Sequence, residues 1–271
     1  MKKSTQPSPL RFFSSRTAFR LCLSLPMLVI LTLLSACSES PQSASDESTD
    51  KKHIHFLYNF STRSLDPHVD SSYVPLRAGI TETLVKLDEE QLKVVPWLAE
   101  SWEGGDGIHW TINLREGITF HNGKTMDGAS VKASLERAMT ENVAIRNALN
   151  ISQIEAEGNQ LRISTTRPFP EFISELVNPN VSIIDVTESD FNQRLTGTGP
   201  FRLVSFAPGS KLELARYDAY WDGASKLDSV TFSFNEDANA RTLALQSGQV
   251  DIVYVPKWKA WKYCGHKKGS K

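Results

Sequence analysis

Between His53 and Val255, short strand patterns and short helix patterns follow one another in no regular alternation. Residues 108–115 alternate apolar and polar side chains, as a half-buried strand does. Residues 128–139 instead repeat apolar side chains at helical spacing behind Asp127, a residue type that caps helices. Because the elements show neither a βαβ cadence nor a short repeat, this stretch predicts an α+β (mixed α/β) fold.

The same patterns predict other elements along the stretch. Predicted strands are 53–60, 181–186 and 229–236, and predicted pairs of strands joined by a turn are 151–166 and 197–221. Predicted helices are 76–87, 168–179 and 237–249. With 40% hydrophobic residues in 271, the chain has enough apolar side chains to fill a core of this size.

The first 36 residues have the composition of an export signal. They contain five basic residues and no acidic one, and an uncharged, mostly apolar run extends from Leu21 to Cys37. A membrane-spanning helix needs about 20 apolar residues, whereas this run is shorter and includes Pro26. We therefore predict a signal peptide over residues 1–36 rather than a permanent span.

The end of that run predicts a lipid anchor. Leu34–Cys37, Leu-Ser-Ala-Cys, resembles a bacterial lipobox, in which Cys37 would be lipidated and become the first mature residue. An incidental cysteine is the alternative. Residues 37–52 are rich in Ser, Asp and Glu and have little to bury, so they predict a flexible tether. The expected product is an exported protein, anchored to the membrane and facing the periplasm or the cell exterior, with its fold over residues 53–256.

Charge and motifs exclude several functions for the body of the chain. Removing the eleven basic residues of the two ends leaves 19 basic and 31 acidic residues between 37 and 256, which disfavours nucleic acid as a partner. The common catalytic and phosphate-binding motifs are missing, so we predict neither an enzyme nor a resident cofactor. Gly197–Phe201, Gly-Thr-Gly-Pro-Phe, is a poor phosphate loop because Pro200 has no amide donor, and its glycines instead predict positive φ or close backbone approach.

Two short groups of possible metal ligands are too small for a resident metal site. His53 and His55 would share one face of a strand, and Cys264 lies two positions before His266, but neither pair has a third ligand near it in the sequence. The segment 257–271, which contains the second pair, has six lysines and no acid. We interpret 257–271 as a non-native basic tail.

Three segments together resemble one protein family. They are Val94–Met139, which includes Pro-Trp-Leu-Ala-Glu-Ser-Trp, then Gly197–Gly223, which includes Gly-Thr-Gly-Pro-Phe and Tyr-Trp, and Val230–Val253. Their order and spacing resemble the extracytoplasmic solute-binding proteins of ABC importers, family 5, the peptide and nickel class. The resemblance implies two lobes that close on a small solute about a hinge, delivery to an ABC permease, and no chemistry on the solute.

Members of this family are about twice as long as this chain. The resemblance therefore implies that 53–256 is the first lobe of a two-lobed periplasmic-binding-protein-like fold, that the second lobe is missing, and that the chain is truncated at its C-terminus. Apolar surface should then be exposed where the missing parts would dock. Two alternatives stay open: a non-functional remnant of such a protein, or a sensor or regulator that reuses the fold.

The resemblance also suggests the solute. Residues 141–154 and 176–186 resemble the versions found in nickel or metallophore binders, so the expected solutes are nickel as a chelate, with the metal only a transported ligand, or short peptides. Candidate ligand-binding residues are Tyr73, Arg146, Asn178 and Asn180. Some nickel binders have an arginine near the position of Asn180. Arg146 could instead present a guanidinium fork to a carboxylate of the solute, or it could be a solvated charge on a helix.

Overall fold

The computed structural model describes residues 52–188 and 190–254, and its order of strands and helices is mixed, as predicted. Its strands form one five-stranded sheet, one four-stranded sheet and one two-stranded hairpin. Within the described residues, no helix is long and apolar enough to cross a membrane. The predicted signal, the tether up to residue 51, Cys37 and the basic tail lie outside the described residues.

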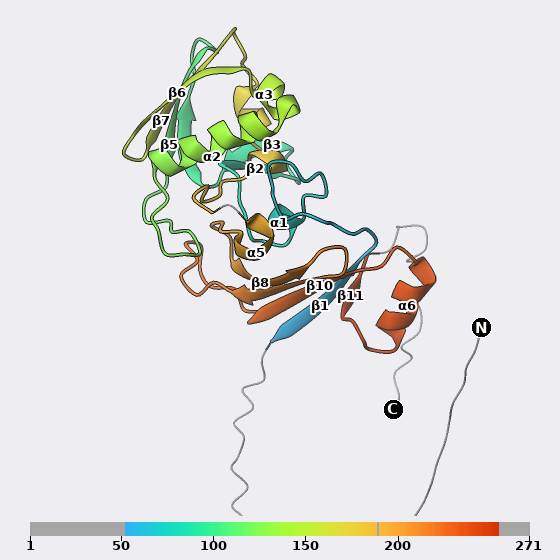
Figure 1. Cartoon of the computed structure of the whole chain (residues 1–271). Helices are drawn as coiled ribbons and strands as arrows, with labels where there is room; N and C mark the ends of the chain where they lie inside the picture. Colours follow the sequence, from blue (N-terminus) through green and yellow to red (C-terminus); the bar gives the residue numbers. More distant parts are fainter. Residues whose placement is uncertain (1–51, 189, 255–271) are drawn as a thin grey trace, which may run out of the picture. The chain divides into compact units, whose positions relative to one another are not determined.

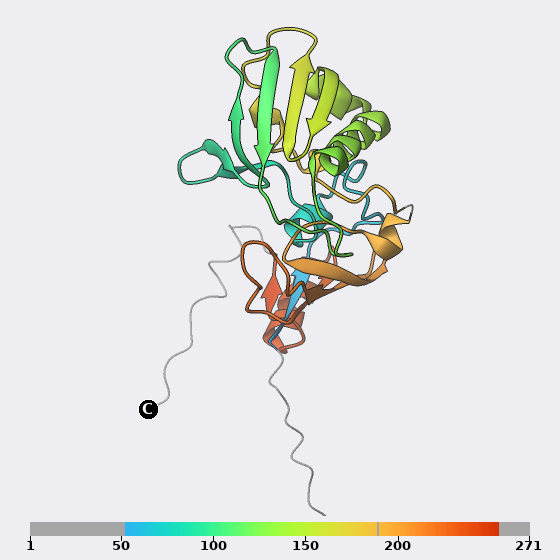
Figure 2. The ribbon, with the colours of Figure 1, turned by 90° about the vertical axis from the view of Figure 1, so that its left-hand side faces the viewer.

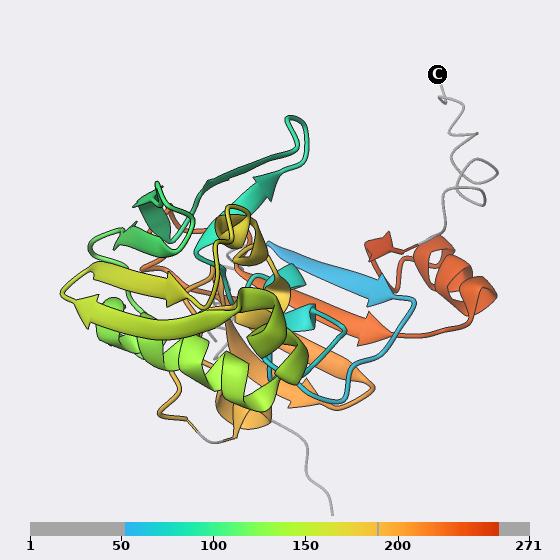
Figure 3. The same ribbon diagram turned by 90° about the horizontal axis from the view of Figure 1, so that it is seen from above.

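The five-stranded sheet is built around the first strand of the described chain. β1 (His53–Tyr58) pairs in parallel with β10 (Ser229–Phe234) on one side and with β11 (Ile252–Val253) on the other. β9 (Lys211–Arg216) and β8 (Phe201–Ala207) extend the β10 side with antiparallel pairs. In Figure 3, β1 and β10 run side by side with their arrowheads toward the same edge. The carboxyl ends of three parallel strands therefore meet at one edge.

The four-stranded sheet is antiparallel throughout. Its order is β4 (Ala99–Glu103), β5 (His109–Leu114), β7 (Gln160–Thr165) and β6 (Ile151–Glu157). Figure 2 shows these strands with helices packed on one face. The alternation over 108–115 is confirmed, because every second side chain of β5 is buried.

Two consecutive helices cover this sheet, as Figure 1 shows. α2 (Gly128–Glu141) begins behind Asp127, whose side chain accepts a hydrogen bond from the Ser130 amide, while the Ser130 side chain accepts one from the Asp127 amide. This reciprocal cap explains why the helix starts where the sequence predicts. Asn142 ends α2 and caps α3 (Val143–Leu149).

The remaining elements are short. They are α1 (Val74–Arg77), β2 (Val85–Asp88), β3 (Lys93–Pro96), α4 (Phe172–Glu175), the 3-10 helix η1 (Pro179–Val181), α5 (Phe191–Arg194) and α6 (Ala238–Gln246). The predicted helix over 237–249 is confirmed by α6, which Asp237 caps. Large apolar side chains are exposed on α6 and just beyond it, at Leu243, Leu245, Ile252 and Tyr254.

Two hydrophobic clusters fill the described part of the chain. One lies between the four-stranded sheet and α2, α3 and α4, and includes Ile112, Leu135 and Phe172. The other lies on the five-stranded sheet beneath α1 and α5, and includes Val74 and Leu214. Each sheet therefore carries its own core.

The predicted helix over 76–87 is wrong. α1 ends at Arg77, Gly79 adopts a positive φ of 72°, and the chain then runs extended into β2. The apolar spacing was misleading because residues 80–85 are buried on all sides, including the polar Thr81 and Thr83. A helix with one apolar stripe would leave its other face in water.

The predicted strand over 181–186 and helix over 168–179 are also corrected. Ile183 alone of that strand forms a β-bridge, with Glu82, and Pro179 opens η1 instead of ending a long helix. The helix shrinks to the four residues of α4.

The glycines of Gly197–Phe201 allow the close approach that the sequence suggests. A Cβ on Gly197 would lie 2.1 Å from the Ile80 carbonyl oxygen, and one on Gly199 would lie 2.2 Å from the Gly79 oxygen. Neither glycine has a positive φ. Close packing of two backbones, rather than a phosphate loop, therefore accounts for this motif.

A buried carboxylate joins segments that are far apart in the sequence. Oε1 of Glu82 accepts hydrogen bonds from Trp97 Nε1 (2.8 Å) and Tyr220 Oη (2.7 Å), and Oε2 accepts them from Thr198 Oγ1 (2.7 Å) and Trp221 Nε1 (3.2 Å). Burial raises the pKa of Glu82, and the four hydrogen bonds oppose that rise. We call this group the Glu82 clasp.

Candidate functional site

The loop that follows β1 shapes the candidate site at the carboxyl ends of β1, β10 and β11. In sheets with parallel strands, ligands bind outside these ends. The loop reaches α1 through Tyr73, whose φ of 57° is unusual for a residue with a side chain. Strained backbone of this kind is found at binding sites.

Two hollows adjoin at this edge. The first, of about 330 Å³, is lined by Phe60, Ser61, Thr62, Arg63, Asp70, Ser71, Ser72, Tyr73 and Arg77. The second, of about 360 Å³, is lined by Phe56, Tyr58, Asn59, Phe60, Arg77 and Tyr254. Phe60 and Arg77 belong to both, so they form the wall between a hydroxyl-rich hollow and an aromatic one. We call the pair the β1-edge hollows.

The aromatic side chains of the second hollow pack on one another. The ring centroids of Phe56 and Tyr58 are 4.5 Å apart, and those of Tyr58 and Phe60 are 5.1 Å apart. Burial raises the pKa of Tyr58, although the charge of Arg77 nearby acts in the opposite direction. This row of rings gives the hollow a firm apolar wall.

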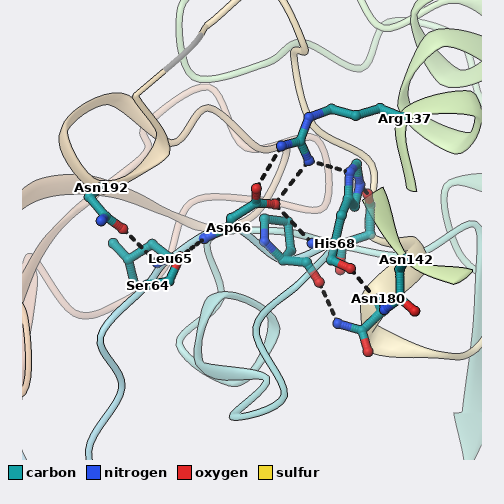
Figure 4. A network of polar contacts seen from close by, with 10 residues as sticks. Ser64, Leu65, Asp66, His68, Arg137, Asn142, Asn180 and Asn192 are labelled. Atoms are coloured by element: carbon teal, nitrogen blue, oxygen red, sulfur yellow. Dashed lines mark hydrogen bonds and ion pairs between the residues drawn. The ribbon is translucent and has the colours of Figure 1, made fainter. Parts of the chain in front are cut away.

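A polar network holds the loop in place (Figure 4). Arg137 of α2 donates to both carboxylate oxygens of Asp66, at 2.9 and 2.6 Å, and to Nδ1 of His68 at 2.7 Å. Nε2 of His68 lies 3.0 Å from the Ser182 carbonyl oxygen. Burial lowers the pKa of His68 to about 4, so its ring is neutral at pH 7, accepting at Nδ1 and donating at Nε2.

Two asparagines complete the network in Figure 4. Nδ2 of Asn180 donates to the carbonyl oxygens of Pro67 (2.6 Å) and Asp70 (3.1 Å). Nδ2 of Asn142 donates to the His68 carbonyl oxygen at 3.0 Å. Side chains of the loop are thus bound by Arg137 of α2, and its backbone carbonyl oxygens by Asn142, between α2 and α3, and Asn180 of η1. These contacts make the loop a rigid support.

The comparisons with known proteins agree on one family. The model of the middle part of the bacterial extracellular solute-binding proteins, family 5, matches residues 93–271, well over half of the chain. The chain belongs to family 5.

Two curated relatives illustrate the range within family 5. The nickel-binding protein NikA of Staphylococcus aureus is 32% identical over 222 residues, which are 82% of this chain and 43% of NikA. The glutathione-binding protein GsiB of Shigella flexneri serotype 5b is 33% identical over 209 residues, 72% of this chain and 40% of GsiB. The chain spans less than half the length of the curated relatives that it matches.

Two solved structures also match over slightly less than half of their own length. The nickel ABC transporter protein from Bacillus halodurans is 68% identical, with a TM-score of 0.78, over 81% of this chain and 46% of that one. S. aureus NikA in complex with Ni(L-His)2 is 33% identical, with a TM-score of 0.75, over 80% of this chain and 46% of that one. The described residues are thus one lobe, the first part of the periplasmic-binding-protein fold.

The structure places the four candidate residues of this family 5 lobe in different surroundings. Tyr73 lines the first of the β1-edge hollows. Asn180 is buried, and its side chain is hydrogen-bonded to the loop. The backbone N–H of Asn180 donates to Oδ1 of Asn178 at 2.9 Å. Arg146 is exposed on α3 and is not among the lining residues. A direct contact of any of them with solute stays a prediction.

Other residues of the site escaped the sequence reasoning. Arg77 was placed inside the wrongly predicted helix over 76–87, so its position beside a hollow could not be foreseen. Phe60 and Tyr254 lie almost 200 positions apart in the chain. Only the pairing of β1 with β11 brings their surroundings together. Among the described residues, no three His, Cys, Asp or Glu side chains are grouped as a metal site would require.

Proposed function

We propose that the chain captures a small solute outside the cytoplasm, foremost nickel held in a complex with amino-acid or metallophore chelators, for delivery to an ABC permease. The observation that carries the proposal is the pair of β1-edge hollows, one rich in hydroxyls and one aromatic, at the carboxyl ends of parallel strands. Such a surface suits an organic solute that carries polar groups. The 68% identity with the B. halodurans protein supports nickel as the cargo.

The proposed mechanism is closure of two lobes on the solute. This lobe would offer a rigid half-site, because the polar network fixes the loop below the hollows. The solute would favour the closed state by touching both lobes at once. No covalent chemistry on the solute is needed for this role.

Anchoring is part of the proposal. Lipidation of Cys37 would hold the protein on the outer side of the membrane, where the segment 37–52 would give the lobe reach toward the permease.

Binding can be tested with a chimaera. Residues 53–254 replace the matching segment of the B. halodurans protein, which supplies the rest of a full-length family member, and calorimetry follows the titration of Ni(II) with two equivalents of L-histidine. S. aureus NikA, whose structure holds Ni(L-His)2, is the positive control. We expect saturable binding. Absence of heat in the chimaera, with binding by NikA in the same buffer, would contradict the proposal.

Short peptides are the second candidate, because GsiB, named for glutathione, is 33% identical to this chain. The same chimaera titrated with glutathione and with a tripeptide separates the two solutes. Heat with these probes and none with nickel–histidine would transfer the assignment to peptides.

A further inference from the structure

Arg77 differs in its partners from the ion-paired arginines of the described chain. Arg137 is paired with Asp66, Arg216 with Asp218 and Asp228, Arg162 with Glu157 and Arg194 with Glu188. Within residues 52–188 and 190–254, no carboxylate lies within ion-pair distance of the Arg77 guanidinium, and no hydrogen bond to it is formed. Its contacts are aromatic: the guanidinium carbon lies 5.7 Å from the ring centroid of Phe60 and 5.7 Å from that of Tyr73.

The two rings preorganise this cation. Cation–π contacts hold a guanidinium by its face and leave its N–H groups directed outward in the plane. Tyr73 reaches its position through the unusual φ of 57°, and the network of Figure 4 fixes the loop that carries it. A donor held in this way loses less entropy when a ligand binds.

The acidic residue that lines the first hollow already accepts hydrogen bonds from neighbouring residues of the loop. Asp70 is the acidic residue among those lining the first hollow. Its Oδ1 accepts a hydrogen bond from Thr62 Oγ1 at 3.1 Å, and its Oδ2 accepts from the Ser72 amide at 3.2 Å and from the Ser72 hydroxyl. Arg63 also lines this hollow and has no ion pair among the described residues. The charged side chains that line the first hollow are therefore two arginines, Arg63 and Arg77, and one carboxylate, Asp70, so the hollow carries a net positive charge.

We propose that Arg77 is the carboxylate-recognition residue of this lobe, with the solute's apolar or imidazole part against the aromatic hollow of Phe56, Tyr58, Phe60 and Tyr254. A carboxylate accepts two parallel N–H bonds from a guanidinium, and such charge-assisted pairs are stronger than neutral ones. The inference deepens the proposed function and rests on it. It places the solute's anionic group on the wall between the two hollows.

The test follows Arg77 directly in the full chain. Side-chain Nε–H signals of 15N-labelled arginine are recorded during titration with L-histidine, with nickel–histidine in a 1:2 ratio, and with glutathione. Histamine, which keeps the imidazole and amine of histidine but lacks the carboxylate, is the matched probe. Three variants are compared: R77Q, R77K, which keeps the charge without the fork, and R167Q, which removes an exposed arginine outside both hollows.

The expected result is a saturable shift of the Arg77 signal with the carboxylate probes and none with histamine. R77Q should weaken binding by about 10- to 100-fold, as loss of one charge-assisted pair implies. R77K should bind with intermediate affinity, and R167Q should match the parent. Thermal melts of all variants should coincide with that of the parent, because Arg77 is exposed and has no polar partner among the described residues.

The contrary results are distinct. If the parent binds nickel–histidine or glutathione and R77Q binds it equally well, the role of Arg77 is overturned while the proposed function stands. If R167Q loses as much affinity as R77Q does, the loss reflects overall charge, and the role of Arg77 is likewise overturned. If the parent shows no shift and no binding with any probe, and the chimaera also shows none, the proposed function fails and the inference fails with it.

Discussion

Replacing Glu82 with glutamine should destabilise the lobe although the two side chains have nearly the same shape. In the Glu82 clasp, one indole donates to each carboxylate oxygen: Trp97 to Oε1 and Trp221 to Oε2. A glutamine must put its NH2 group in one of these two positions. In either orientation, two N–H groups then point at each other and one buried donor is left without an acceptor.

The expected loss is about 1.5–3 kcal/mol, the range for a hydrogen bond to a charged group whose partner stays buried. For a domain of this size, one kcal/mol corresponds to about 2–4 °C in Tm. E82Q should therefore melt roughly 4–10 °C below the parent. The hydroxyls of Thr198 and Tyr220 can rotate to accept a hydrogen bond from the new NH2 group, but this supplies no acceptor for the indole that has lost its own.

The pH dependence gives a second readout of the same residue. The folded-state pKa of Glu82 lies above its ordinary value of 4.5 because the carboxylate is buried. A raised pKa contributes stability that is fully present below the unfolded-state value and is lost as the pH rises through the folded-state value. The stability difference between the parent and E82Q should consequently grow as the pH falls toward 4.5.

Urea unfolding followed by tryptophan fluorescence measures both effects, and Trp97 and Trp221 report on the clasp itself. E100Q, which neutralises an exposed glutamate, is the matched control and should leave the midpoint unchanged. Equal stability of E82Q and the parent at pH 7 would refute the geometric reasoning. A difference that shrinks as the pH falls would refute the assignment of the raised pKa to burial.

Three further predictions follow from other residues. Gly199→Ala should destabilise the lobe by more than about 3 kcal/mol, because its Cβ would lie 2.2 Å from the Gly79 oxygen. Gly105→Ala, which has open space around it and no positive φ, should cost much less; urea melts compare the two, and equal losses would contradict the packing argument. Burial lowers the pKa of His68 from 6.5 to about 4, so its contribution to the free energy of unfolding should be complete above pH 6.5 and be lost, by roughly 3 kcal/mol, as the pH falls toward 4. H68Q should flatten the plot of unfolding free energy against pH over this range, and an unchanged slope would contradict the prediction. Cys37→Ala should abolish incorporation of labelled fatty acid and release the protein from the membrane fraction, and labelling that persists would refute the lipid anchor.

Elements governed by local rules could be predicted from the sequence. The alternation of β5 and the cap of α2 at Asp127 depend on residues a few positions apart, and both appear where expected. The error over 76–87 has the opposite origin. Leu84 and Ile80 have helical spacing, but their segment is surrounded on every side by later parts of the chain, including Gly197 and Gly199. Tertiary burial therefore overrode the local pattern.

The candidate site could be predicted only in part. Tyr73 was a candidate that accompanied the family resemblance, and the structure places it on a hollow, while its contact with solute stays a prediction. The role of Asn180 in holding the carbonyl oxygens of Pro67 and Asp70 could not be foreseen, because these partners are more than 100 positions away. Arg77 and Tyr254 share a hollow for the same long-range reason, through the pairing of β1 with β11.

The pairing of β1 with β10 also has a consequence for how the chain folds. His53 is aligned with Ser229, so β1, an inner strand of the five-stranded sheet, must wait for partners that are synthesised 176 positions later. The four-stranded sheet and α2 lie within residues 99–165 and can form earlier. Long-range parallel pairing is slow, because the entropy of closing a long loop opposes it. The edge that carries the hollows is thus the last part of the lobe to be completed, and slippage or aggregation during folding should begin from the unpaired β1.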